Sequence, residues 1–424
     1  MKLVKTTIYT STSQIITILS GIITVKVVAS KIGPEGISLV GQFQNITAIM
    51  LLIATLAIGQ GVVKYLAEYS YDKTKQQQVI KTGLWMVVIT SLIVAVVVLL
   101  SSKALSIYSF KRPDYSSVYL LFSIFLPLVS FNAFANFVLN GLKYISYFTL
   151  VNITASIINL IITIILANKL GVYGVLISTN FVNLFLLFFN LFMFNTYRPF
   201  SFSSLKFGID KPILIALLKF SSMGFLAGFG LPFCQLLIRN KLISIYGIEM
   251  AGQWQAVSRI SDFYLGFVLS VLGVYYLPRF SELINKYSLK TEVLNAYKYL
   301  IPVVSIMAFV IWLLRYFIIK TLLTERFLPS AELFGFQMLG DVFKVMAWLL
   351  SSLLWAKAMT KTYLMLDTIF FILYILITYS CISLFGFKGV AIGFFAEYLL
   401  YWLVLIIIFS KYLGVRKTIL INEK

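Results

Sequence analysis

Apolar segments long enough to cross a membrane follow one another along the whole 424-residue chain. A helix of about 20 residues spans the ~30 Å hydrocarbon core of a bilayer, and each segment approaches that length. The linkers are short and contain no folded polar domain. The sequence therefore predicts an all-α polytopic membrane protein with about twelve transmembrane helices. We expect these helices at residues 8–30, 40–68, 79–101, 117–140, 145–168, 173–196, 213–238, 250–277, 297–320, 332–356, 363–384 and 389–410.

Composition agrees with this prediction and excludes several functions. The chain is 60% hydrophobic and 12% charged, whereas a soluble domain carries about 25% charged residues. The first apolar run is too long and too rich in polar residues for a cleavable signal peptide. Histidine is absent, and Cys234 and Cys381 lie inside apolar runs, so we expect no metal site, cofactor or disulfide. Without a nucleophile–base set or a phosphate loop, we expect no catalytic residues and no enzyme.

The chain repeats itself. Val40–Gln44 (VGQFQ) reads again as Ala251–Gln255 (AGQWQ), 211 residues later. The same offset relates Gly36 to Gly247. One matching pentapeptide is weak support, but a register that persists over six spans indicates a duplicated unit.

A second motif extends the repeat, since Leu170–Val175 (LGVYGV) returns as Phe385–Val390 (FGFKGV) at an offset of 215. We therefore expect two six-helix lobes, residues 1–210 and 211–424, with Tyr197–Pro212 as the linker. Because each half has an even number of spans, both enter the membrane from the same face. The lobes are then parallel repeats, an arrangement that places the substrate site between them.

The net charge of +20 comes from residues in the loops and residues in the spans, and the two groups have different meanings. Loop Lys and Arg residues favour one side of the membrane, so the positive-inside rule places both termini in the cytoplasm. The same loop charge attracts anionic membrane lipids. Nucleic-acid binding would need a solvated basic domain, and the chain has no span long and polar enough to form one.

Charged residues inside the predicted spans are the candidate site residues, because charge at bilayer depth costs at least about 2.5–3.5 kcal/mol. Six basic residues could bind an anionic substrate: Lys26, Lys64, Arg239, Arg259, Arg315 and Lys344. Four acidic residues are candidates for coupling or ion pairing: Asp262, Asp341, Asp367 and Glu397. A cavity with surplus positive charge suits a diphosphate better than a cationic drug.

Each candidate also has a structural interpretation. Lys26, Lys64, Arg239 and Arg315 lie near helix ends, where long side chains can extend to the interface. Arg259 and Lys344 each have an acid three residues away, a spacing that permits a local ion pair. Arg239 has no acid at that spacing, which makes it the strongest ligand candidate.

Polar and small residues also form stripes on the first helix of each half, at spacings of three and four. The stripe of helix 213–238 includes Ser221 and Gly224 and leads to Arg239. These stripes either line the substrate path or form a seam for close helix packing. Gly21 and Pro232, equivalent at the 211-residue offset, are either hinges that bend mid-membrane or inert kinks.

Four segments of the sequence resemble a known family. Gly252–Leu265, Trp312–Arg315, Phe336–Val345 and Val63–Tyr69 are similar to the Wzx polysaccharide flippases, which transport O-antigen and enterobacterial lipid III precursors. This family belongs to the multidrug/oligosaccharidyl-lipid/polysaccharide exporter superfamily. Matching positions carry over Arg239, Asp262, Arg315, Asp341 and Lys344, with Lys26 and Lys64 less closely matched. Arg259 occupies a position that need not be basic in the family.

The resemblance implies a function in lipopolysaccharide biosynthesis. It implies two lobes around a V-shaped cationic cavity, in the bacterial inner membrane. Alternating access would move undecaprenyl-diphosphate-linked oligosaccharide from the cytoplasmic to the periplasmic leaflet. Partners would include membrane lipids, a polysaccharide polymerase and a chain-length regulator.

Two alternatives remain. A cation-coupled multidrug exporter of the same superfamily would share the fold, but such exporters use an acidic residue in helix 1, where this chain has none. A membrane polysaccharide polymerase or ligase would need a large periplasmic loop with basic catalytic residues, and every loop here is short.

Overall fold

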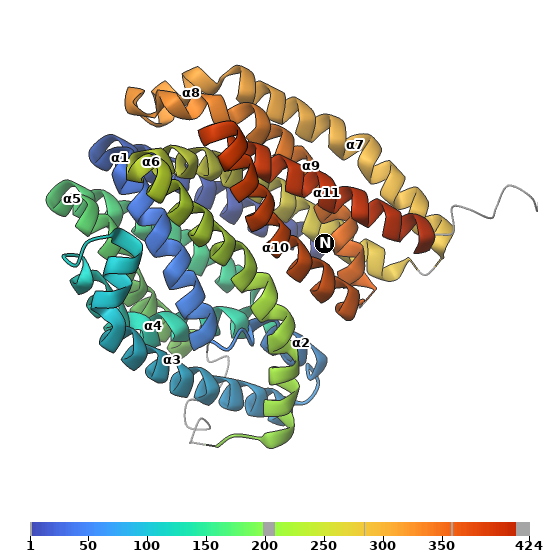
Figure 1. Cartoon of the computed structure of the whole chain (residues 1–424). Coiled ribbons are helices and arrows are strands. Elements are labelled where there is room, and N and C mark those ends of the chain that lie inside the picture. The colour runs from blue at the N-terminus through green and yellow to red at the C-terminus, as the bar shows by residue number, and fades with distance from the viewer. Residues whose placement is uncertain (1, 198–207, 284, 358, 413–424) are drawn as a thin grey trace, which may run out of the picture. The chain divides into compact units, whose positions relative to one another are not determined.

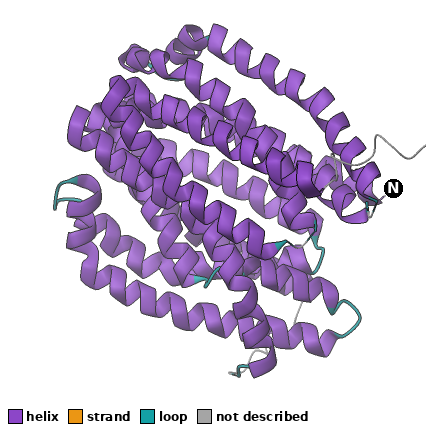
Figure 2. Ribbon diagram, turned by 45° about the vertical axis from the view of Figure 1, so that its right-hand side comes forward, coloured by secondary structure: helices purple, strands orange, loops and turns teal. Residues whose placement is uncertain are grey.

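The computed structural model describes residues 2–197, 208–283, 285–357 and 359–412, and all regular structure in these ranges is helical (Figure 1, Figure 2). The expected linker lies mostly outside the described residues, because it includes 198–207. Contacts divide the chain into two compact units, Met1–Arg239 and Asn240–Lys424. We call these the N-terminal and C-terminal units and describe each by itself.

The helices follow the apolar segments closely. The N-terminal unit contains α1 (Lys2–Ala54), α2 (Gly59–Glu68), α3 (Lys73–Phe110), α4 (Ser116–Gly141), α5 (Ile145–Tyr197) and the first part of α6 (Lys211–Glu282). The C-terminal unit contains the rest of α6, α7 (Lys286–Leu313), α8 (Arg315–Leu322), η2 (Glu325–Leu333), α9 (Phe334–Ala356), α10 (Thr360–Phe385), η3 (Gly386–Lys388) and α11 (Gly389–Tyr412). The contact boundary falls inside α6, so it differs from the repeat boundary at 210/211, which stays a prediction.

Turns at glycine account for the number of spans. In the described residues, eight helical segments are long and apolar enough to cross a membrane, and four of them are 43 to 60 residues long. Each of these four contains one glycine with a left-handed φ: Gly33 (64°), Gly171 (57°), Gly247 (82°) and Gly386 (67°). Glycine adopts this conformation without a Cβ penalty, so the chain turns there and starts a second helix. Four divided segments and four single ones give the twelve expected spans, and the all-α fold is confirmed.

The second turn of each half also repeats in detail. Gly174 follows Gly171 by three residues, and Gly389 follows Gly386 by the same distance. At both Gly174 and Gly389, an added Cβ would lie 2.1 Å from the backbone carbonyl oxygen eight residues earlier. The two LGxxG-like motifs therefore build the same tight turn, which supports the internal repeat.

The first turn corrects the expected register. Gly33, and not Gly36, has the left-handed conformation that Gly247 has, so the offset at the turn is 214 residues. The N-terminal half therefore has three more residues between this turn and the GQ motif. Counted from the turns, Gly21 lies twelve residues before Gly33, whereas Pro232 lies fifteen before Gly247. The two expected hinge positions are thus not equivalent, and the backbone is helical at both.

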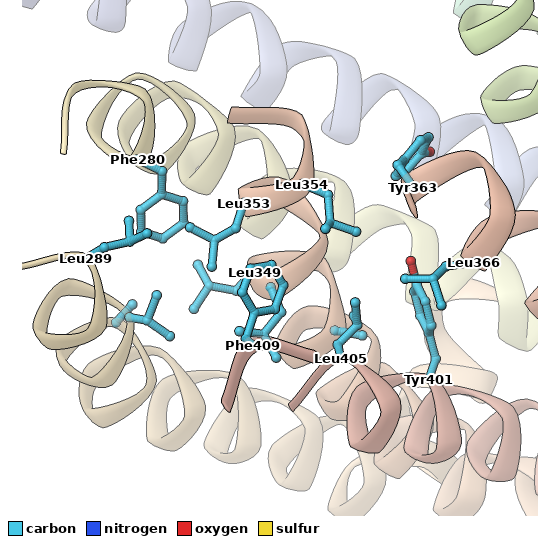
Figure 3. Close-up of a cluster of buried hydrophobic side chains, with 14 of the residues drawn as sticks. Phe280, Leu289, Leu349, Leu353, Leu354, Tyr363, Leu366, Tyr401, Leu405 and Phe409 are labelled. Atoms are coloured by element: carbon cyan, nitrogen blue, oxygen red, sulfur yellow. The ribbon is translucent and has the colours of Figure 1, made fainter. Parts of the chain in front are cut away.

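Each unit has an apolar core of its own. In the C-terminal unit, Phe280, Leu289, Leu349, Leu353 and Leu405 bring together the end of α6 with α7, α9 and α11 (Figure 3). Tyr363 and Leu366 connect α10 to the same cluster. This packing fixes α9 against α10 and α11, the helices that carry most of the expected acidic residues.

In the N-terminal unit, amide side chains connect α4 to α5. Asn132 Nδ2 donates a hydrogen bond to the Asn183 carbonyl oxygen at 2.8 Å, and Asn190 Nδ2 donates to Asn132 Oδ1 at 3.1 Å. Hydrogen bonds of this kind between spans replace the hydrophobic driving force that lipid does not supply.

Candidate functional site

A group of buried charged residues lies in the C-terminal unit, on α9 and α11. Asp341 on α9 has no solvent exposure, and Glu397 on α11 is 5% exposed. Lys344, one turn along α9, interacts electrostatically with both carboxylates. The helices approach closely at Gly340, where an added Cβ would meet the Phe394 ring at 2.4 Å. We call Asp341, Lys344 and Glu397 the charge cluster.

Two neutral side chains satisfy the buried Asp341. The Tyr264 hydroxyl, on α6, donates a hydrogen bond to Asp341 Oδ2 at 2.7 Å. Gln337 Nε2, four residues before Asp341 on α9, donates to its other oxygen at 3.4 Å. The sequence analysis assigned no role to either residue. Gln337 is predictable from helical spacing, whereas Tyr264 comes from another helix and only the tertiary structure brings it to Asp341.

Lys344 is bound differently from the local ion pair that its spacing suggested. Among the described residues, neither Asp341–Lys344 nor Arg259–Asp262 forms an ion pair within 4.0 Å. The Lys344 ammonium instead lies 5.8 Å from the centre of the Phe394 ring and 5.7 Å from that of Tyr398. Aromatic faces attract a cation, so these two rings of α11 hold the ammonium.

Three further charged candidates of this unit, Asp367, Asp262 and Arg259, are linked to the cluster. Asp367 on α10 accepts a hydrogen bond from the Tyr401 hydroxyl at 2.8 Å and interacts electrostatically with Glu397. Exposed Asp262 interacts electrostatically with Asp341 and with Arg259, which is half-buried. All four expected acids therefore gather here with only two of the six expected bases. The surplus of positive charge expected for the spans as a whole does not hold for this group.

Arg239, the strongest ligand candidate, lies in the N-terminal unit and has no solvent exposure. Its Nη1 donates a hydrogen bond to Oε1 of Gln42, which is also fully buried, at 3.1 Å. Gln253, the counterpart of Gln42 in the repeated motif, donates to the Arg326 carbonyl oxygen at 2.7 Å. The repeated GQ motif thus places a buried glutamine beside an arginine in each half.

The other three span cations lie at the surface. Lys26 is exposed on α1. Lys64 on α2 lies 3.9 Å from Glu68 and 4.5 Å from the centre of the Phe220 ring. Arg315 stacks over its neighbour Trp312, with the guanidinium carbon 4.9 Å from the ring centre. The contacts of Lys64 and Arg315 are those of interfacial anchors.

A break in the second span was missed by the sequence analysis, which expected one helix over 40–68. The helix ends at Ala54, and α2 begins at Gly59. Between them, Leu56 and Ala57 have left-handed φ values of 51° and 50°. Non-glycine residues rarely adopt this conformation, so the surrounding structure must hold it. The sequence around the break is apolar and gives no signal of it.

Hydroxyl groups from two other helices support the break. Thr90 Oγ1 on α3 donates to the Ala54 carbonyl oxygen at 2.6 Å, and Ser221 Oγ on α6 donates to the Leu56 carbonyl oxygen. Gly224, one turn after Ser221, allows close approach, because an added Cβ would lie 2.7 Å from the Ala57 carbonyl oxygen. Irregular backbone at membrane depth requires such partners, since lipid supplies none.

The polar stripes pack against other helices. On α1, Ser13 and Ser20 are buried, and Thr17 shares a hydrogen bond of 2.9 Å with Ser156 on α5. Ser221 and Gly224 on α6 face the break just described. Ser13, Ser20, Ser221 and Gly224 therefore take part in helix packing within the N-terminal unit, whereas Gln14 and Thr17 of the first stripe are exposed.

Comparison with known proteins shows which family this chain belongs to. The family model described as "polysaccharide biosynthesis protein" matches residues 3–284, about two-thirds of the chain. The chain belongs to this polysaccharide biosynthesis protein family. The match includes Arg239 and the broken second span, and ends before the charge cluster.

Two curated relatives extend the similarity over almost the whole chain. The lipid III flippases of Escherichia coli (strain K12) and Shigella flexneri are each 28% identical over 403 residues, covering 95% of this chain and 97% of theirs. That coverage includes α9, with Asp341 and Lys344.

Solved structures share the fold at low sequence identity. An inward-facing multidrug resistance MATE family transporter of the MOP superfamily superimposes with a TM-score of 0.80 at 16% identity, over 96% of each chain. A MOP superfamily transporter from Pyrococcus furiosus, noted for the reversed polarity of its binding pocket, has a TM-score of 0.70 at 14% identity, over 96% of this chain and 97% of its own. This family member therefore has the fold of MOP transporters and is a multi-pass membrane protein.

Proposed function

We propose that this protein is a flippase that moves a lipid-linked oligosaccharide across the bacterial inner membrane. The observation that carries the proposal is the full-length similarity to two lipid III flippases, at 28% identity over 403 residues. The polysaccharide biosynthesis family and the MOP transporter fold support the same conclusion. Because these relatives are flippases and not enzymes, the chain carries its substrate without changing it.

The finer parts of the proposal rest on charge and on the repeat. The cargo is undecaprenyl-diphosphate-linked oligosaccharide, and Arg239 is its first candidate phosphate ligand. The positive-inside bias favours both termini in the cytoplasm. Transport from the cytoplasmic to the periplasmic leaflet is the direction that the resemblance to polysaccharide flippases implies. A polymerase and a chain-length regulator would use the product on the periplasmic side. We infer alternating access between two parallel repeats.

Bending at Gly21 and Pro232 would accompany this change of access. Substitution Pro232→Ala restores a backbone donor and should slow transport without unfolding the protein. Spin-label distances across each helix, measured with and without the substitution, test the hinge; an unchanged distribution with unchanged flux would reject it.

A multidrug exporter is the second candidate, favoured by the MATE fold of the solved structures. Their identity of 16% supports the fold alone. The two candidates predict different phenotypes: loss of an exporter sensitises cells to cationic compounds, and loss of a flippase blocks surface polysaccharide.

The deciding experiment is deletion of the gene in its own host, with no redundant flippase present. We expect loss of the surface polysaccharide and accumulation of its lipid-linked precursor on the cytoplasmic leaflet, restored by the wild-type gene. Leaflet assignment comes from labelling of the precursor by an impermeant sugar-oxidising reagent in intact and lysed spheroplasts. Normal precursor translocation in the deletion strain would remove the proposal, and altered dye resistance alone would favour the exporter.

A further inference from the structure

A groove of about 570 Å³ lies between α7 and α9 of the C-terminal unit. Its walls are almost wholly apolar and include Ala308, Phe309, Trp312, Gly335, Phe336 and Leu339. Phe309 is 58% exposed and Leu339 is 50% exposed, so the groove opens on the surface of these helices. Gly335 contributes to its depth, because an added Cβ would meet only the Trp312 ring, at an ordinary contact distance of 3.6 Å.

One end of the groove is marked by a cation. Trp312 lines the groove, and the Arg315 guanidinium stacks over its ring. Arg315 Nη1 also donates a hydrogen bond to the Trp312 carbonyl oxygen at 2.8 Å. A guanidinium has five N–H donors, so most of them remain for another partner. Tyr316 stacks on the same guanidinium at 4.6 Å.

The position of Arg315 is that of a membrane interface. Here α7 ends at Leu313, and the short α8 follows with a second cation, Lys320. Tryptophan and tyrosine gather at headgroup level, where one end of the side chain is apolar and the other is wet. The groove thus runs from apolar bilayer depth to a basic, aromatic end, which is the polarity of a lipid molecule.

We propose that this groove binds one hydrocarbon chain of an anionic phospholipid, whose phosphate is held by Arg315. The volume lies within the range of about 300–1,000 Å³ typical of pockets that enclose one small ligand, so it fits a single chain. A polyprenyl chain of the cargo is far longer and would extend well beyond it. Anionic headgroups complement the basic end, and an arginine can grip a phosphate at two oxygens. This site is separate from transport and does not depend on the proposed cargo.

Native mass spectrometry of the purified full-length protein tests the site. The probes are dioleoyl phosphatidylglycerol and dioleoyl phosphatidylcholine, which share their chains and differ in headgroup charge. We expect tighter retention of the anionic lipid. Arg315→Gln should weaken that lipid about fivefold, the effect of one basic residue near a headgroup, without changing the neutral one. Gly335→Leu should reduce the retention of both lipids, since the leucine side chain fills the groove.

Matched variants separate the site from general surface effects. Gly266→Leu is the control for filling, because an added Cβ there has nothing within 4 Å. Arg326→Gln removes an exposed arginine of the same unit. Neither control should change lipid retention, and the melting temperature of every variant reports folding. Equal retention of the two lipids by the wild type, or unchanged selectivity in Arg315→Gln, would overturn the proposal. Displacement of phosphatidylglycerol by undecaprenyl phosphate would also overturn it, by assigning the groove to the cargo.

Discussion

Arg239 and Gln42 form a buried contact between a guanidinium and an amide, and both residues lack solvent exposure. We expect Arg239→Ala to abolish complementation of a flippase-null strain, beyond what any fall in its protein level explains. Arg239→Lys should restore it only in part, because an ammonium lacks the planar fork of a guanidinium. Gln42→Leu should lower stability, since loss of a buried partner costs about 1–3 kcal/mol.

The control for this set is Gln44→Leu, an exposed glutamine two residues from Gln42, which should leave level and function unchanged. Complementation is read beside the protein level in membranes. Normal transport by a fully folded Arg239→Ala protein would end the phosphate-ligand assignment and leave Arg239 a structural residue.

The charge cluster makes a second prediction at this scale. Asp341→Leu leaves the Tyr264 hydroxyl without its acceptor and removes one of the two carboxylates near Lys344, and Lys344→Met leaves both carboxylates without a nearby cation. Breaking a buried ionic contact by removing one partner costs about 3–5 kcal/mol, so each single variant should express poorly. The double variant should recover part of that level, and adding Glu397→Gln should recover more.

Membrane protein levels and detergent melting curves measure this series, with exposed Glu325→Gln of the same unit as the control. If the double variant falls as far as the two single variants combined, Asp341 and Lys344 act independently and the cluster is not an energetic unit.

At the scale of the helices, the broken second span gives a prediction about two alanines that lie three residues apart. The same substitution, alanine to glycine, should raise the melting temperature at one of them and lower it at the other. Ala57 has a left-handed φ of 50°, a conformation that costs a residue with a Cβ about 1–2 kcal/mol, so Ala57→Gly should raise the melting temperature. Ala54 is the last residue of a regular helix, where glycine costs at most the about 1 kcal/mol of a helix interior and relieves no strain, so Ala54→Gly should lower it.

Both alanines are buried, so the loss of one methyl group is matched between the two variants. Melting of the purified protein in one detergent is the measurement. A decrease in both variants would mean that the second span is a continuous helix, as the sequence alone suggested.

For the whole molecule, the four glycine turns predict the topology. If each turn separates two spans, cysteines placed beside them at Lys31, Lys169, Ser244 and Lys388 lie on one aqueous face, all outside the cytoplasm. In a background with Cys234→Ala and Cys381→Ala, an impermeant maleimide should label all four in intact cells.

A cysteine at Lys143, in the connection between α4 and α5, should react only after the inner membrane is permeabilised. Failure of the four turns to label would mean that the long segments cross the membrane only once, as eight spans. Labelling of the position at Lys143 in intact cells would reverse the orientation.

The sequence by itself determined the features that depend on local pattern. Apolar length predicted the twelve spans, because lipid forces each crossing to be a complete helix. The repeated GQ and LGxxG-like motifs predicted the duplication, and Gln337 could be paired with Asp341 from helical spacing alone. A single span, a turn glycine and a residue four positions away are all local properties.

Only the tertiary structure decided the rest, because the physical cause lies on another helix. The break at Leu56 and Ala57 is held by hydroxyls from α3 and α6, and no local sequence signal marks it. Lys344 has an acid at the spacing of an ion pair, yet its ammonium lies against two rings of α11. Arg239 has no acid at helical spacing in the sequence, and the fold buries it against Gln42. In an environment without water, a polar group takes its partner from whichever helix packs beside it, and that neighbour is set by packing.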